Sequence, residues 1–250
     1  DASCSNFAGG WPAVLHVDDD ARAGGDGTTW ATAITHLRDA LHQARLANEA
    51  GYHVEEVRVA GGLYKPHLGT PSPLEWPKTF VLVDGTAMRG GWRGAFAGKG
   101  DPNARDYAAF ESRLSGDLLG DDGPPHTSTN RGENSKLVVL ALEGQQDVVF
   151  EGFAVTNGHV GGNYSSNPFQ QYGAAMRCHR GSPEITFCRF HDNQAYEYGG
   201  LALLRPVSAV VRDCTFTFKG RLSGPYGAGL STIRLDGEFT NAKATITRCR

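Results

Sequence analysis

A degenerate repeat in the second half of the chain constrains the fold more than any other feature of the sequence. An apolar residue is followed three positions later by Phe or Cys, and two positions after that by another apolar residue. The pattern occurs at Phe150-x-x-Phe153-x-Val155, Ile185-x-x-Cys188-x-Phe190, Val211-x-x-Cys214-x-Phe216 and Ile246-x-x-Cys249. Its middle position recurs after 35, 26 and 35 residues, and a glycine-led element repeats in phase at Gly173–Met176, Gly199–Ala202 and Gly227–Leu230. Two elements in phase over three periods predict a coiled repeat, with longer periods where a loop is inserted.

The repeat predicts an all-β fold, a right-handed parallel β-helix (a solenoid). In such a fold each coil contributes short strands that pair with the equivalent strands of neighbouring coils, so equivalent residues stack on one another. We expect the repeated apolar side chains to point inward and Arg189, Arg212 and Arg248 to point outward, because side chains alternate along a strand. Glycines are expected at the sharp corners between strands.

The first part of the chain predicts a helix followed by irregular strands. Apolar residues at spacings of three and four predict an amphipathic helix over residues 31–50, and Gly51 follows as a stop signal. We expect this helix to cap the apolar end of the first coil, because the end of a solenoid needs a cover. Residues 93–135 are rich in Gly, Asp, Pro and Asn and predict a long excursion, with a strand signal at Leu114.

The expected organisation is a single domain. It spans residues 1–250, with an N-terminal cap region at 1–60 and regular coils at 137–250. Three explanations stay open for the last coil: the chain continues beyond it in a longer protein, copies stack end to end, or the coil is covered by its own loops.

Composition narrows the classes of function. The net charge of -3 and the 20% of charged residues indicate neither a nucleic-acid partner nor binding to an anionic membrane. No apolar run approaches the ~20 residues that a transmembrane helix needs. Of the five cysteines, Cys188, Cys214 and Cys249 occupy repeat positions and are expected to be buried thiols. A bridge between the remaining two, Cys4 and Cys178, is left open.

Several segments carry a resemblance to a known family. They are Val17–Asp20, Gly25–Thr28, Trp30–Ala33, Leu37–Leu41, Val57–Pro66, Gly90–Trp92, Leu114–Asp117 and Ser182–Phe190. Together they resemble bacterial right-handed parallel β-helix surface proteins of the pectate-lyase-like superfamily, over most of residues 14–249. The resemblance implies the fold and an extracellular or cell-surface location. It does not imply one activity, because the family contains adhesins, matrix proteins and polysaccharide lyases.

The insertions between coils contain most of the candidate binding residues. They fall at 156–172, 191–198 and 217–226, each between the last apolar position of one repeat and the next glycine corner. We therefore expect the inserted loops to lie on one side of the helix. The candidate glycan-binding residues are their tyrosines: Tyr164, Tyr172, Tyr196, Tyr198 and Tyr226. Aromatic rings pack against sugar faces while polar groups bind hydroxyls. The alternative is that these rings only pack the loops onto the sheet.

A calcium-dependent polysaccharide lyase is the alternative function. Such an enzyme needs a basic residue beside a carboxylate-bound Ca²⁺. The candidates are Lys219 or Arg221 as the base, with Asp192 and Glu197 as the carboxylates. A glycoside hydrolase is less favoured. Its convergent carboxylates would have to be Asp192, Glu197, Asp213 and Asp236, which lie on different faces of the repeat. Whether the protein is an enzyme stays open.

The acidic run near the N-terminus is a second candidate site. Asp18 and Asp20, with Asp26 nearby, are candidate Ca²⁺ ligands, because clustered carboxylates suit hard cations. Their spacing does not match an EF-hand loop, and a structural role is the alternative. The sequence thus predicts an extracellular or cell-surface structural or adhesive protein that contacts glycans. The alternatives are the lyase and a self-assembling filament or matrix subunit.

Overall fold

The computed structural model describes residues 10–69, 78–123, 129–160, 173–195, 199–217, 230–233 and 243–250. Within these ranges the structure is mostly β, with three sheets in which every pairing is parallel. Helical structure is limited there to α1 (Leu37–Glu49) and the 3-10 turn η1 (Trp30–Thr32). We name the sheets A, B and C.

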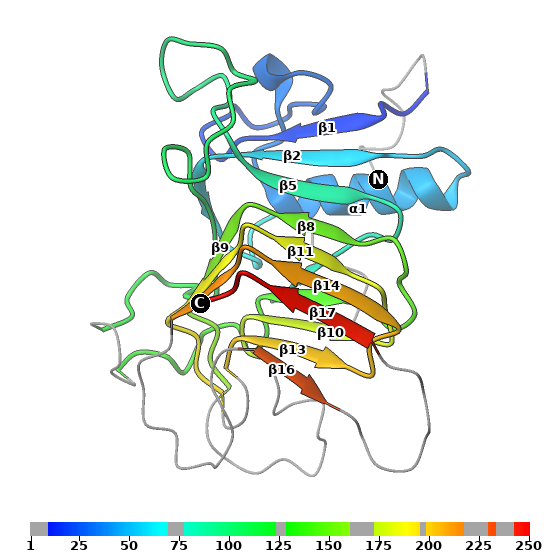
Figure 1. Ribbon diagram of the computed structural model, residues 1–250. Helices are drawn as coiled ribbons and strands as arrows, with labels where there is room; N and C mark the ends of the chain where they lie inside the picture. Colours follow the sequence, from blue (N-terminus) through cyan, green and yellow to red (C-terminus); the bar gives the residue numbers. More distant parts are fainter. Residues whose placement is uncertain are drawn as a thin grey trace.

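Sheet A is the largest. Its seven strands are, in spatial order, β1 (Val14–Val17), β2 (Glu56–Ala60), β5 (Ala87–Trp92), β8 (Val149–Glu151), β11 (Glu184–Thr186), β14 (Ser208–Arg212) and β17 (Lys243–Thr247). In Figure 1 these strands lie one below another, with α1 beside the upper ones.

Sheets B and C have five strands each. Sheet B contains β3 (Gly62–Tyr64), β6 (Ser112–Ser115), β9 (Phe153–Thr156), β12 (Arg189–His191) and β15 (Thr215–Thr217). Sheet C contains β4 (Phe80–Val81), β7 (Val139–Ala141), β10 (Met176–His179), β13 (Leu201–Leu204) and β16 (Leu230–Ile233). From β2 onward the chain visits A, B and C in turn, so neighbouring strands in a sheet lie one circuit apart in sequence.

The predicted ladder of apolar residues is present in sheet A. Phe150 pairs with Ile185, Ile185 with Val211, and Val211 with Ile246. The first three side chains are fully buried, whereas Ile246 is 44% exposed. Each of the buried ones lies between two neighbours of the same ladder. Ile246 lies on β17, the last strand of the sheet, so only one of its sides is covered in the described part of the chain.

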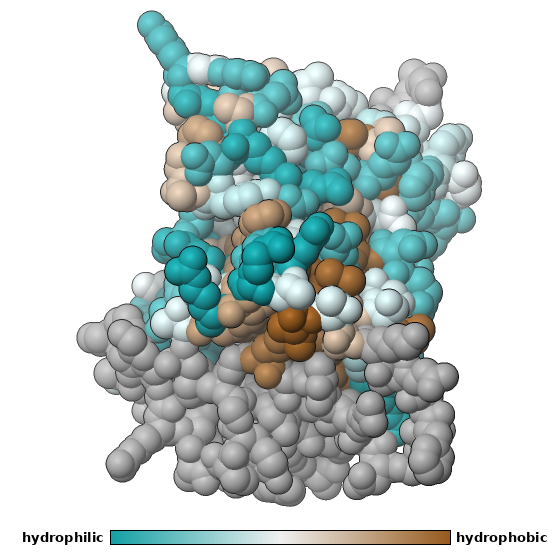
Figure 2. Space-filling model, viewed as in Figure 1, coloured by the Kyte–Doolittle hydropathy of each residue, from teal (hydrophilic) through white to brown (hydrophobic). Residues whose placement is uncertain are grey.

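The space-filling view shows a similar difference in exposed apolar surface between the upper and lower strands. The upper part of the face in Figure 2 is mostly hydrophilic, and apolar surface appears over the lower strands. Exposed large apolar residues of this half include Phe187, Val207 and Ile246. The predicted outward positions Arg189, Arg212 and Arg248 are all exposed, as expected from the alternation.

The later corners between sheets A and B do not use glycine, contrary to the prediction. Glycine forms the corner between β2 and β3 (Gly61) and the corner between β8 and β9 (Gly152), whereas the equivalent residues of the later circuits are Phe187, Asp213 and Arg248, all with positive φ. The left-handed region is unfavourable for residues with a Cβ. Asp213 and Arg248 form an ion pair across two circuits, and the ring of Phe187 stacks on Tyr107 at 5.3 Å between centroids. These contacts help to offset the backbone strain.

The helix is shorter than predicted. It covers Leu37–Glu49 rather than 31–50. Thr29 and Thr32 form a capping box that closes the separate turn η1, and Ile34 then pairs with Val17 at the edge of β1. Residues 31–36 therefore bind neighbouring segments instead of continuing a helix. The apolar face of α1 packs against β1, β2 and β4 and belongs to the same core as the strands.

The excursion at 93–111 is held against sheet A by a cluster of aromatic and charged side chains. The guanidinium groups of Arg58 and Arg105 lie over the ring of Trp92, at 4.7 and 5.1 Å from its centroid. Glu151 accepts hydrogen bonds from Arg105 and from the hydroxyl of Tyr107, at 3.0 and 2.6 Å. The strand predicted around Leu114 is β6. No helix in the described part of the chain is long and apolar enough to cross a membrane.

Candidate functional site

The connections from sheet B to sheet C carry most of the inserted residues. They are residues 65–79, 116–138, 157–175, 192–200 and 218–229. The connections from A to B contain only one or two residues, except for the excursion at 93–111. We call the side of the molecule where the strands of sheet B end and these connections begin the loop flank.

The strand ends that anchor the loop flank are in register. The three tyrosine-bearing loops follow Thr156, His191 and Thr217, which are neighbours in sheet B. The loops return at Met176, Leu201 and Leu230, which are neighbours in sheet C. The three loops therefore start from adjacent positions and end at adjacent positions, as the spacing of the repeats predicts.

Most of the candidate residues on these loops lie outside the described residues. These are the glycan-binding candidates Tyr164, Tyr172, Tyr196, Tyr198 and Tyr226, and the lyase candidates Glu197, Lys219 and Arg221. Their predicted roles stay predictions. Of the carboxylates considered for a hydrolase, Asp213 lies at a corner between sheets A and B and is paired with Arg248.

Asp192 is the lyase candidate that the structure describes. It directly follows β12 and has a φ of 56°. Its Oδ2 atom lies 2.9 Å from Nδ1 of His191, and its main-chain oxygen accepts a hydrogen bond from Nη1 of Arg131 at 2.9 Å. Asp192 is thus fixed at the base of the loop flank by contacts with a neighbouring connection.

A polar cluster in the connection 116–138 was not predicted from the sequence. Asp117, Asp122 and Glu133 place one oxygen each within 4.8 Å of the others. Arg131, among the largest fully buried side chains, lies beside them with its Nε 3.8 Å from Oδ2 of Asp122. An acidic, glycine-rich excursion was visible in the sequence. Its spacing of carboxylates matches no known motif, so the sequence held no signal that these three groups would meet.

The acidic run near the N-terminus also forms a cluster, with a different membership from the one predicted. Asp18 and Asp20 lie together with Asp19, with one oxygen of each within 4.8 Å of the others. Asp26 is not part of this group; its Oδ1 accepts hydrogen bonds from the hydroxyls of Thr28 and Thr32. Asp26 therefore closes its own loop, and the structure groups Asp19 instead of Asp26 with Asp18 and Asp20. The predicted Ca²⁺-binding role of Asp18, Asp20 and Asp26 stays a prediction.

Burial changes the ionisation of this N-terminal group. Asp18 is 2% exposed, and burial raises its pKa to about 6. Burial also raises the pKa of Asp19. One oxygen of each of these two carboxylates is buried without a hydrogen-bond partner. A buried carboxylate that lacks a partner favours its protonated form.

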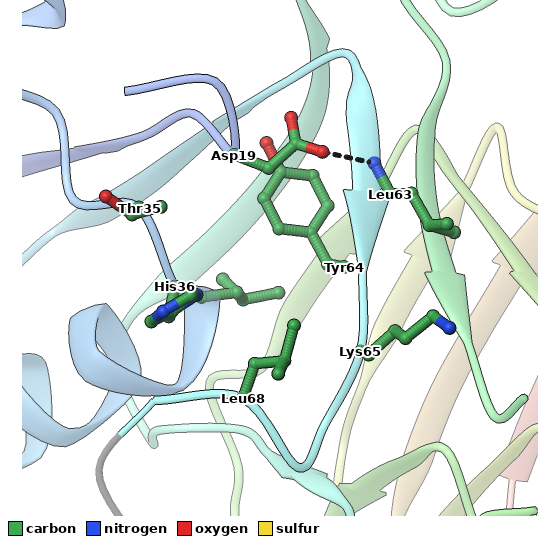
Figure 3. A pocket seen from close by; sticks show the side chains of 8 residues that line it. Asp19, Thr35, His36, Leu63, Tyr64, Lys65 and Leu68 are labelled. Carbon is green, nitrogen blue, oxygen red and sulfur yellow. Dashed lines mark hydrogen bonds between the residues drawn. The ribbon is translucent and has the colours of Figure 1, made fainter. Parts of the chain in front are cut away.

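A small pocket adjoins the acidic run. Its volume is about 230 Å³, and Figure 3 shows Asp19, Thr35, His36 and Lys65 around it with apolar side chains between them. Oδ2 of Asp19 accepts a hydrogen bond from the main-chain N–H of Leu63 at 2.8 Å. The pocket is smaller than the ~300 Å³ at which ordinary small-molecule sites begin. It lies where the first B-to-C connection starts, so it marks one end of the loop flank.

Comparison with known proteins gave no match: no family model, curated protein or solved structure is significantly similar to the chain.

Proposed function

We propose that the three sheets form a right-handed parallel β-helix of the pectate-lyase-like kind, with α1 as its N-terminal cap. The repeated passage from A to B to C supports this fold, because each circuit adds one strand to every sheet. The position of α1 against β1, β2 and β4 supports the cap, since these are the first strands of sheets A and C.

The protein in this proposal is an extracellular or cell-surface structural or adhesive protein that binds glycans through the loop flank. The observation that carries the proposal is the register of the loop anchors. Thr156, His191 and Thr217 are adjacent in sheet B, so the loops that follow them start side by side. These loops contain five of the eight tyrosines in the chain. Aromatic rings gathered along one flank would offer stacking surfaces to successive sugar units of a polymer.

The scaffold suits such a role because it is rigid where the loops begin. The residues that precede the first two anchors in sheet B, Val155 and Phe190, are 0% and 2% exposed, and the ring of Phe190 stacks on that of Phe216 at 5.0 Å between centroids. Loops on a rigid scaffold are common binding surfaces, and a fixed framework lowers the entropy that binding must offset.

A glycan array with matched variants tests the proposal. The wild-type protein should bind a subset of polysaccharides. Combined Tyr172→Ala, Tyr196→Ala and Tyr226→Ala should weaken that binding by roughly 100-fold, because three stacking contacts of about 1 kcal/mol each are lost. Tyr52→Ala is the control, because Tyr52 is exposed on the connection between α1 and β2. Unchanged binding by the triple variant, or no binding by the wild-type protein, would contradict the proposal.

An activity assay on the same purified protein distinguishes glycan binding alone from a polysaccharide lyase. Asp192, one of the candidate lyase residues, directly follows β12 and so begins a connection of the loop flank. This position is the reason to test for lyase activity. Incubation with pectate and alginate, with and without Ca²⁺, should leave the ultraviolet absorbance unchanged if the flank only binds glycan. Unsaturated products that disappear in Lys219→Ala or Arg221→Ala would instead assign a lyase.

A further inference from the structure

Three carboxylates of the connection between β6 and β7 converge at the base of the loop flank. They are the cluster of Asp117, Asp122 and Glu133 described above. A tight turn folds around Asp117, whose Oδ1 accepts the main-chain N–H of Gly120 at 2.6 Å. The side chain of Asp122 is 5% exposed. Carboxylates this close repel one another unless positive charge lies between them.

Among the described residues, the positive charge beside this cluster does not balance its three carboxylates. The buried guanidinium of Arg131 offsets one carboxylate through its approach to Asp122. The ammonium groups of Lys65 and Lys78 donate to the main-chain oxygens of Leu118 and Glu133 instead of to the carboxylates. Three carboxylates beside one buried guanidinium leave two negative charges, which equals the charge of one divalent cation.

A neighbouring amide provides an independent observation. Asn134 is 4% exposed, and its Nδ2 donates to Oδ2 of Asp122 at 3.0 Å and to the main-chain oxygen of Asn157 at 2.8 Å. Both neighbours are acceptors, so they fix which end of the amide carries the nitrogen. The amide oxygen Oδ1 is buried without a partner, and so is Oδ1 of Asp122. Buried oxygens without donors are costly and call for a ligand.

We infer that Asp117, Asp122 and Glu133, together with the amide oxygen of Asn134, form a calcium-binding site. Carboxylate and amide oxygens are the ligands that hard cations prefer, and Ca²⁺ tolerates an irregular set completed by water. Mg²⁺ fits less well, because it requires near-octahedral geometry and releases its water reluctantly.

The site would link three connections of the loop flank. Asp122 accepts a hydrogen bond from Nδ2 of Asn157, the first residue after β9, at 2.6 Å. Arg131, which lies against Asp122, donates to the main chain of Asp192, the first residue after β12. A cation on Asp122 would therefore order the bases of two tyrosine-bearing loops. The calcium site does not depend on glycan binding by those loops.

Calorimetric titration of the chelator-treated full chain with CaCl2 tests the site. The wild-type protein should bind Ca²⁺. The double variant Asp117→Asn with Glu133→Gln should bind it at least ~10-fold more weakly, a loss seen even for residues that only support metal ligands. Asp121→Asn is the matched control, because Asp121 lies in the same connection, is exposed and is outside the cluster. It should bind as the wild type does.

Thermal unfolding with and without Ca²⁺ gives a second measurement on the same proteins. Calcium should raise the melting temperature of the wild type and of Asp121→Asn, because a ligand of the native state stabilises it. The double variant should show little rise, and the single variant Glu133→Gln replaces it if the double variant does not fold. The inference is overturned if the wild type binds no Ca²⁺, if the variants of the cluster bind as tightly as the wild type, or if only Asp18→Asn abolishes binding.

Discussion

The thiol of Cys214 donates a hydrogen bond to the main-chain oxygen of Ile185, one circuit earlier in the chain, over 3.6 Å. Cys188 makes the same contact with Phe150 at 3.7 Å, and Cys249 with Val211 at 3.8 Å. Each cysteine therefore lies directly against the circuit before it. The cysteines follow the positive-φ corners between sheets A and B, where a small side chain can turn inward and still reach a carbonyl group.

The cysteines should differ in reactivity according to their depth. Burial raises the pKa of Cys178 to about 12 and that of Cys188 well above its usual value, and Cys214 is also buried. Because the thiolate is the reactive form, Cys178 and Cys188 should resist alkylation in the native protein. The contact with Cys188 lowers the pKa of Cys214, but Cys214 is 1% exposed, so lack of access to the reagent should protect it. The half-buried Cys249 should react first. Peptide mapping by mass spectrometry after timed treatment with iodoacetamide measures the order, and rapid labelling of Cys188 would contradict it.

Equivalent positions of the sheet A ladder should differ in their contribution to stability. Ile185→Ala removes a fully buried side chain between two neighbours and should lower the free energy of unfolding by about 2–5 kcal/mol. The same change at Ile246, which pairs with Val211 in the same ladder but is partly exposed, should cost about 1 kcal/mol or less. Urea denaturation of both variants measures the difference. Equal losses of unfolding free energy in the two variants would contradict the difference in burial between Ile185 and Ile246.

Stability should decrease as the pH rises through the titration of Asp18. Its folded pKa of about 6 lies above the usual value of 3.8, so the folded state holds the proton more tightly than the unfolded state. Between about pH 4 and pH 6 the unfolded state binds fewer protons, and the free energy of unfolding therefore falls with rising pH. Asp18→Asn should remove its part of this decrease and stabilise the protein at pH 7, as measured by thermal unfolding in EDTA, while the part due to Asp19, whose pKa burial also raises, should remain.

Asp26→Asn is the control for that experiment. Burial is the largest single influence on the pKa of Asp26 and raises it, but the hydrogen bonds from Thr32 and Thr28 together outweigh burial and lower the pKa. A lowered pKa stabilises the folded protein at pH values above the usual pKa of 3.8, and this stabilisation is lost as the pH falls through the folded pKa. The control should thus be destabilised at pH 7. An Asp18→Asn variant that loses stability at pH 7 would contradict the account of the acidic run.

Glu151 should hold the excursion 93–111 on sheet A. Glu151→Ala removes the acceptor for Arg89, Arg105 and Tyr107, and leaves partly buried donors without a partner. Limited proteolysis should then cut the excursion several times faster. Glu184→Ala breaks a more exposed pair with Arg212 and should change neither proteolysis nor stability by more than about 1 kcal/mol. Equal protection of the excursion in both variants would contradict this role.

The parts of the fold that were predicted correctly depend on local periodicity. The apolar ladder follows from the repeat itself, because residues such as Ile185 and Val211 recur at the same position of each circuit. The outward arginines follow from alternation along a strand. The helix was predicted too long because Ile34 fits the helical spacing but pairs with Val17 instead, a contact between separate segments.

The candidate sites were less predictable because they are formed by contacts between circuits. Phe187 adopts a corner conformation that favours glycine, and nothing in its own sequence context indicates the stacking partner Tyr107. Asp122 meets Glu133 and Arg131 only after the connection 116–138 has folded onto its neighbours. Asp26 was grouped with Asp18 by proximity in sequence, but local hydroxyl groups bind it first.

Methyl contacts in solution test the stacking of successive circuits most directly. In a protein labelled at the Ile, Leu and Val methyl groups, nuclear Overhauser spectra should connect Ile185 with Val211 and Val211 with Ile246. No cross-peak should connect Ile185 with Ile246, because Val211 lies between them. A direct contact between Ile185 and Ile246, or the absence of both expected contacts, would contradict the register on which the loop flank depends.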